Sequence, residues 1–174
     1  MWESKEGRRD RSALDACFDR FDRQAGDKIP AAFPGFHDID RDASTQPSHG
    51  FLDPRAGETF RQSLTRALAS KPRMIQIATW NDFGEGTEAE PTREVGYCHL
   101  ESIQNARRGQ VGNDFTYLAA DLRVPLRIHQ LRKRFATALP ARSALDQAAD
   151  LIALGDVASS LRIISRLEEA SPPP

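Results

Sequence analysis

A short apolar run that ends in an acidic, glycine-bearing segment constrains this chain more than any other feature. The run Met74–Thr79 is nearly apolar and rich in β-branched residues, which predicts a strand buried on both faces. The residues that follow, WNDFGEGTEAEP, bring together carboxylates, an amide, an indole and glycines. In α/β proteins, sites are built at the carboxyl ends of strands. We therefore expect a functional site directly after this strand.

The same segment resembles the signature of a family of glycoside hydrolases. Asn81 to Glu85 is similar to a segment of fungal α-1,3-glucanases, and Glu85 to Pro91 is similar to one of endo-α-mannosidases. Sequences of this mixed kind are described as glycoside hydrolase family 71/99-like. The resemblance is specific over residues 29–104. It implies an α/β fold, the C-terminal part of a (β/α)8 TIM barrel, with Met74–Thr79 as the eighth strand and a short strand ending near Phe33 as the seventh.

The resemblance also implies a reaction and the residues that perform it. The activity is hydrolysis of an α-linked glycan by two carboxyl groups with different tasks, without a cofactor or a metal. Asp82 and Glu85 match the catalytic carboxylates, with Glu85 as the acid and Asp82 as the base. Asp82 is one methylene shorter than the glutamate of the mannosidases. The residues expected to contact sugar are Trp80, Asn81 and Phe83 in the segment, and His37 and Asp38 at the mouth of the seventh strand.

Simpler interpretations of the same residues stay open. The segment could be an acidic turn with Trp80 in the core, and His37 with Asp38 could be a solvated loop pair. A non-catalytic remnant, which binds carbohydrate or a partner without a working cleft, is the alternative function. Four carboxylates within nine residues could bind Ca²⁺, but their spacing is not that of an EF-hand loop.

Length limits how much of such a barrel this chain can contain. A complete barrel needs about 250 residues, whereas the chain has 174 residues. We expect residues 1–106 to form part of a barrel and residues 107–174 to form an α-helical extension. A truncated reading frame, an excised fragment and a small protein of another fold all fit this length. Missing strands would leave edges and apolar faces uncovered, which predicts association with an upstream fragment or with a second copy.

Charge and cysteine content exclude several other classes. The net charge of −1 gives no electrostatic reason to expect nucleic acid as a partner. Two cysteines are too few for a disulfide framework, and no apolar run approaches the roughly 20 residues of a membrane span. The N-terminal residues are charged and have no apolar core, so the sequence predicts no signal peptide. We expect a cytoplasmic chain as written, while a full-length relative could be exported.

Apolar periodicity predicts the helices. Stripes at helical spacing predict helices over residues 10–24 and 57–70, and a third helix over residues 93–105 that Thr92 caps. Residues 40–54 are predicted to form a loop over the site. After a glycine-bearing break at residues 107–113, a basic helix and an αα-hairpin over residues 143–169 are expected. The basic helix is interpreted as a solvated face, with arginine stems covering apolar surface.

Overall fold

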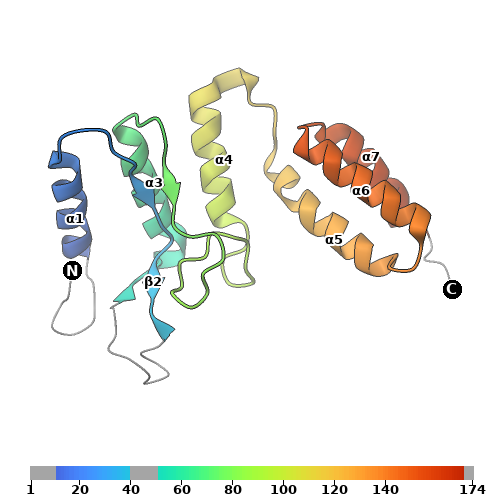
Figure 1. The fold of residues 1–174 in the computed structure, drawn as a ribbon, viewed down its shortest axis with the longest axis horizontal. Helices are drawn as coiled ribbons and strands as arrows, with labels where there is room; N and C mark the ends of the chain where they lie inside the picture. The colour runs from blue at the N-terminus through green and yellow to red at the C-terminus, as the bar shows by residue number, and fades with distance from the viewer. Residues whose placement is uncertain (1–10, 40–50, 171–174) are drawn as a thin grey trace. The chain divides into compact units, whose positions relative to one another are not determined.

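The described part of the chain forms two compact units. The computed structural model describes residues 11–39 and 51–170, drawn in colour in Figure 1, so most of the predicted loop at residues 40–54 lies outside it. Unit 1 ends at Gly112 and unit 2 begins at Asn113. This division falls later than the sequence placed it, because α4 (Cys98–Val111) continues through Gly109. The helix stops before Gly112, whose φ of +68° favours glycine.

Within its described residues, unit 1 has short strands and three longer helices (Figure 1). Two pairs of strands form in it, one parallel and one antiparallel. Along the chain, its elements before α4 are α1 (Arg11–Arg23), β1 (Ala31–Ala32), β2 (Phe36–His37), β3 (Phe51–Leu52), the 3-10 helix η1 (Arg55–Gly57), α3 (Glu58–Ala69) and β4 (Gln76–Ile77).

The parallel pair joins β1 to β4. Ala31 lies opposite Gln76 and Ala32 opposite Ile77, and the chain between the two strands passes through α3. This confirms the predicted parallel pairing of the two segments. Each strand has only two residues, fewer than predicted, because Pro30 and Pro34 bound β1 and carry no N–H for a longer ladder. The (β/α)8 class itself stays a prediction.

The core of unit 1 lies where α3 meets this strand pair. Ala32, Phe60 and Leu64 are buried together, and Ile75 and Ile77 pack against them. Phe60 and Leu64 belong to the apolar stripe that predicted α3. The expectation of a strand buried on both faces is wrong, because Gln76 is exposed and Met74 is 63% exposed. Ile75 and Ile77, which alternate with Met74 and Gln76, are half-buried against the cluster.

The helix predicted over residues 93–105 begins later than expected. Thr92 does not cap it; its Oγ1 accepts hydrogen bonds from the N–H groups of Glu94 and Val95, both at 3.2 Å. Thr92 also forms an isolated bridge with Gly96, whose φ is +56°. A local turn therefore satisfies these backbone groups, and α4 starts only at Cys98.

Unit 2 is helical. Its longer helices are α5 (Val124–Arg134), α6 (Leu139–Ala153) and α7 (Val157–Glu169), preceded by the 3-10 helices η2 (Gly112–Asp114) and η3 (Ala119–Arg123). The predicted αα-hairpin is present, and Pro140 lies in the first turn of α6 instead of separating it from α5. Seven buried side chains form the core: Val124, Ile128, Leu131, Phe135, Leu145, Ala148 and Ile164.

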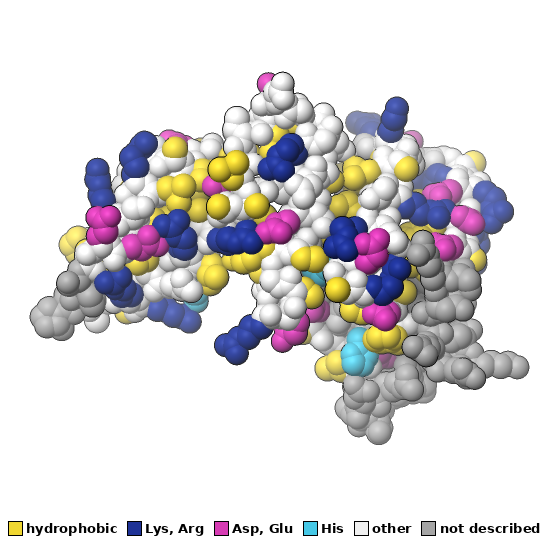
Figure 2. Space-filling model, turned by 180° about the vertical axis from the view of Figure 1, so that it is seen from behind, with side chains coloured by type: hydrophobic (Ala, Val, Ile, Leu, Met, Phe, Trp, Pro, Cys, Tyr) yellow, Lys and Arg dark blue, Asp and Glu magenta, His cyan; other side chains and the backbone are white. Residues whose placement is uncertain are grey.

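Charges on the surface of α5 are paired with acids of the same unit. Arg127 bonds to Glu168 at 2.7 Å, and Arg132 bonds to Asp146 at 2.6 Å. On the face in Figure 2, basic side chains lie beside acidic ones over much of the surface. These ion pairs were not part of the sequence interpretation, which described only a solvated face with arginine stems over apolar surface. Within residues 11–39 and 51–170, no helix is long and apolar enough to cross a membrane.

Candidate functional site

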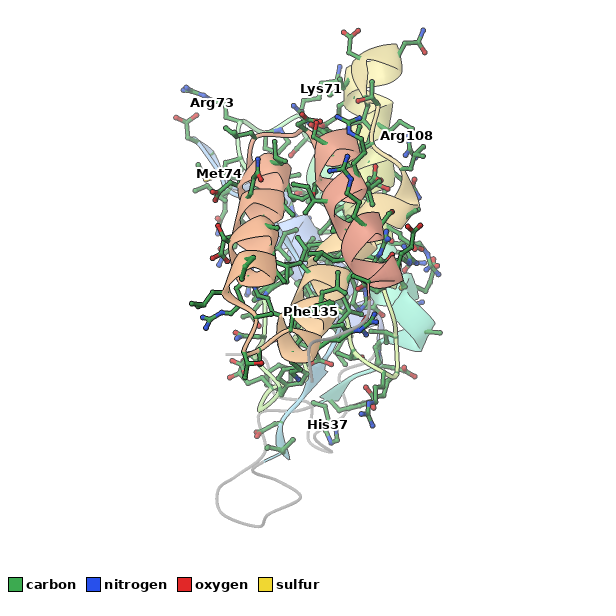
Figure 3. All side chains as sticks on the ribbon, turned by 90° about the vertical axis from the view of Figure 1, so that its right-hand side faces the viewer. His37, Lys71, Arg73, Met74, Arg108 and Phe135 are labelled. Carbon is green, nitrogen blue, oxygen red and sulfur yellow. The ribbon has the colours of Figure 1, made fainter. Side chains whose placement is uncertain are left out.

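The carboxyl end of the β1–β4 pair opens into the acidic segment. The N–H of Gln76 donates to Pro30 O at 2.9 Å, and that of Ala78 donates to Ala32 O at 3.0 Å. In Figure 3, Met74 lies near the upper end of unit 1 and His37 near its lower end. The strand therefore runs from the Met74 end toward the end where His37 lies. The segment after β4 begins there, as the position of sites in α/β proteins predicts.

Two threonines close this segment into a loop. The N–H of Thr79 donates to Thr87 O at 2.8 Å, and the two hydroxyl oxygens are 2.9 Å apart. Thr79 Oγ1 also accepts the N–H of Asp82 at 3.3 Å, and the N–H of Thr87 donates to Asp82 O at 3.1 Å. Residues 79–87 are thus a closed loop with polar groups satisfied inside it, which we call the site loop.

Both predicted catalytic carboxylates belong to the site loop. Asp82 is half-buried and Glu85 is exposed. Asp82 Oδ1 accepts the N–H of Glu85 at 3.1 Å, so the first carboxylate fixes the backbone of the second. Among the described residues, no group donates a hydrogen bond to Asp82 Oδ2, so this oxygen stays available to a ligand.

Glu85 also lines a cavity of about 250 Å³. The other described residues that line it are Leu14, Phe33, Gly35, Phe36, Leu52, Ala78, Thr79 and Thr87. This lining is apolar apart from Glu85 and the two threonine hydroxyls. A mostly apolar hollow with a few convergent polar groups is the usual form of a small-molecule site.

The chain after β1 lies directly against the site loop. The N–H of His37 donates to Glu85 O at 2.7 Å, and that of Ile39 donates to Gly84 O at 3.2 Å. Gly86 allows this approach: its φ is +59°, and a Cβ there would lie 3.1 Å from His37 Cβ. The structure therefore brings His37 and Asp38 beside the loop. Asp38 is buried at 5% exposure, whereas the exposed ring of His37 packs edge-to-face on Phe51.

The aromatic side chains of the loop face solvent. Trp80 is 54% exposed and Phe83 is 55% exposed, so the interpretation of Trp80 as a core residue is wrong. Asn81 is also exposed, and its backbone carbonyl oxygen accepts a hydrogen bond from the N–H of Phe83 at 3.1 Å. Large exposed aromatic rings offer flat surfaces on which the apolar face of a sugar ring can stack.

Sequence reasoning missed the two threonines. Thr79 and Thr87 stand eight positions apart on either side of the glycine-bearing turn, and this symmetric placement was the available signal. Their mutual hydrogen bond, together with that to Asp82, orders the loop that holds Glu85. Across residues 11–39 and 51–170, no group of three or more His, Cys, Asp or Glu side chains is arranged to hold a metal ion.

The chain matches no family model, no curated protein and no solved structure.

Proposed function

We propose that the site loop is the carboxylate loop of a glycan-hydrolysing site, of the glycoside hydrolase 71/99-like kind that the sequence resembles. Glu85 is the general acid, Asp82 the base, and an α-linked glycan the substrate. The observation that carries the proposal is that Asp82, Glu85 and two exposed aromatic rings all emerge from one closed loop at the carboxyl end of a parallel strand pair. The chain is then the C-terminal part of a (β/α)8 barrel with a helical extension.

Each group has a role that its chemistry supports. Glycoside hydrolysis needs one carboxylic acid to protonate the leaving oxygen and one carboxylate to activate water, a sugar hydroxyl or the anomeric carbon. Glu85 borders the mostly apolar cavity, so its carboxyl group lies beside any group that the cavity holds. Trp80 and Phe83 stack on sugar rings, and Asn81 and His37 provide polar contacts; Asp38 is buried beside them and is not in direct reach of a ligand.

Sugar binding without turnover is the second candidate function. The hydrogen bond from the N–H of Glu85 to Asp82 Oδ1 favours it, because this carboxylate already has a structural task in the turn. Exposed Trp80 and Phe83 are sufficient for stacking in either case. Binding and turnover therefore have to be measured separately.

The test uses the full chain with Trp2→Phe, which leaves Trp80 as its sole tryptophan. Oligosaccharides of α-1,3-linked glucose and of α-linked mannose are added while Trp80 fluorescence is recorded, with β-1,4-linked oligosaccharides as the control. We expect a saturable change with an α-linked ligand alone. Release of reducing sugar is measured in the same samples. A folded chain that binds none of these α-linked ligands contradicts the proposal.

Single substitutions distinguish hydrolysis from sugar binding without turnover. Glu85→Gln keeps the shape of the side chain but removes its titratable proton, so turnover should fall by about 10²–10⁴-fold while binding is retained. Glu90→Gln is the matched control in the same segment and should leave turnover unchanged. Phe83→Ala should weaken binding by up to about tenfold, since stacking is worth about 0.5–1.5 kcal/mol. Binding without any turnover in the unmodified chain would favour the second candidate.

A further inference from the structure

Another cavity of unit 1 lies away from the site loop. It has a volume of about 290 Å³ and is lined by residues of α3, of α4 and of the chain that leads into β4, so we call it the α3–α4 cavity. In Figure 3, Arg73 and Met74, which both line it, lie near the upper end of unit 1, whereas His37 lies near the lower end. The α3–α4 cavity is therefore separate from the proposed glycan site.

The lining of the α3–α4 cavity is mostly apolar and continuous with the core of unit 1. Leu64 belongs to the buried cluster of that unit, and Leu68, Ile75 and Ile103 pack against the cluster. Met74 also lines the cavity and is 63% exposed. An apolar group that enters this cavity removes apolar surface from water, which favours its binding.

The charged side chains that line the α3–α4 cavity are all positive. They are Arg73 and Arg107, and none of its described lining residues is acidic. Both arginines are exposed, and neither forms an ion pair with a described carboxylate, unlike Arg61 and Arg66 of α3. Arg107 Nη1 donates to Gln110 Oε1 at 3.3 Å, which leaves the amide N–H₂ of Gln110 as a further donor. The polar part of the lining is thus suited to an anion.

We propose that the α3–α4 cavity binds a small aliphatic carboxylate, of which a medium-chain fatty acid is the simplest example. Its tail lies on the apolar lining, and its carboxylate binds the exposed guanidinium group of Arg73 or Arg107. A guanidinium group can bind a carboxylate through two parallel hydrogen bonds. A volume of about 290 Å³ lies at the lower end of the range for small-molecule sites, which favours such a ligand over a peptide segment. This site does not depend on the proposed glycan hydrolysis.

The test uses the full chain with sodium octanoate as the probe. Methyl NMR spectra are recorded as octanoate is added, and 1-octanol and octyltrimethylammonium provide the same tail with no charge or a positive one. We expect saturable shifts of the methyl signals of Met74, Ile75 and Ile103 with octanoate, weaker binding of octanol and no binding of the cation. Added sodium chloride should weaken octanoate binding, because salt screens the charge of exposed arginines.

Substitutions separate the contribution of charge from that of the apolar lining. Arg73→Gln and Arg107→Gln should each weaken octanoate binding by about two- to fivefold, the effect expected of an exposed ion pair, and leave octanol binding unchanged. Arg93→Gln is the matched control, because Arg93 is an exposed arginine of unit 1 that does not line the cavity. Ala106→Leu places a larger side chain in the cavity and should weaken the binding of both octanoate and octanol.

Three results would overturn the proposal. The first is equal binding of octanoate and octyltrimethylammonium, and the second is octanoate binding that neither Arg73→Gln nor Arg107→Gln weakens more than Arg93→Gln does. The third is a shift of the same methyl signals with protein concentration alone, which would show that a second copy of the chain covers the cavity. If Ala106→Leu does not fold, the arginine variants decide, because they change only exposed side chains.

Discussion

Units 1 and 2 are stabilised by different interactions. Unit 2 buries a cluster of seven apolar side chains among its helices, whereas the buried cluster of unit 1 at the strand pair has three. Unit 1 depends more on polar contacts across long stretches of sequence, such as those between Ser63 and Phe33 and between the chain after β1 and the site loop. Unit 2 is thus held mainly by burial of apolar surface, and unit 1 relies more on specific hydrogen bonds.

The exposed side chains of the site loop account for part of this difference. Trp80, Phe83 and Glu85 are exposed, so the segment contributes little apolar burial to its own unit. Groups that must meet a ligand cannot also be buried in a core, and sites are often found in the less stable part of a protein. The helices of unit 2 have no such constraint in their core.

The largest expected difference is in the response to core truncation. Leu145→Ala in unit 2 should cost about 2–5 kcal/mol of unfolding free energy, because the residue is fully buried in the larger cluster. Leu64→Ala in unit 1 should cost an amount at the lower end of that range, because Leu64 is 6% exposed and belongs to a smaller cluster. Residue-resolved hydrogen exchange measures each unit separately. A greater loss from Leu64→Ala would reverse the comparison.

Loss of a buried serine hydroxyl should cost more unfolding free energy in unit 1 than in unit 2. Ser63 Oγ accepts the N–H of Phe33 at 3.1 Å, so Ser63→Ala removes the acceptor of that N–H and should cost about 1–3 kcal/mol. In unit 2, Ser160 Oγ only donates to Ala148 O at 2.8 Å, and Ser160→Ala should cost about 0.5–1.5 kcal/mol. Urea unfolding of both variants gives the ranking. Equal losses of unfolding free energy in the two variants would show that unit 1 depends on its serine no more than unit 2 does.

Two glycines at positive φ provide a third comparison. Gly155 (φ +83°) lies between α6 and α7, where a Cβ would meet the hydroxyl of Tyr117, whereas a Cβ at Gly26 (φ +94°) in unit 1 would meet nothing within 4 Å. Gly26→Ala should cost about 1 kcal/mol from backbone conformation alone. Gly155→Ala should cost more than Gly26→Ala, and adding Tyr117→Ala to Gly155→Ala should remove this excess. Thermal unfolding of the three variants tests this order.

As the pH is lowered, the two units should lose stability in different pH ranges. Burial lowers the pKa of His99 below its unfolded value of 6.5, so the unfolded chain binds the proton more readily, and unit 1 loses stability as pH falls below about 6.5. In unit 2, the bond from Arg127 lowers the pKa of Glu168 below 4.5; its contribution is lost only as pH falls through that lower value. Hydrogen exchange at pH 7.5, 5.5 and 4 separates the two. His99→Gln should remove the first loss, and a unit 1 that is indifferent between pH 7.5 and 5.5 would contradict the assignment.

Local patterns in the sequence were sufficient for much of the fold. The apolar stripes of α1, α3 and α7 predicted these helices nearly to their ends, because helical periodicity is visible in a single segment. The strand before WNDFGEGTEAEP and its parallel partner were also predicted, as was the position of Asp82 and Glu85 just beyond it.

Features that depend on distant partners could not be predicted. The length of β4 is set by the prolines around β1, which belong to another part of the chain. Thr92 has the chemistry of a helix cap, but Gly96 turns the backbone before a helix can begin. The packing of His99 on Phe60 joins α4 to α3, and no periodic pattern in the sequence records it.

The pairing of Ala31 with Gln76 has a consequence for how the chain assembles during synthesis. The partners are 45 positions apart, so β1 leaves the ribosome long before β4 exists to receive it. Until then the emerging segment has an apolar strand without its neighbour, and closing so long a stretch of chain is slow compared with forming local contacts. The α6–α7 hairpin joins neighbours across a short turn and can form almost as soon as it emerges. The N-terminal unit is thus made first but has to wait longer for its contacts, which makes it the part of the nascent chain that chaperones would protect.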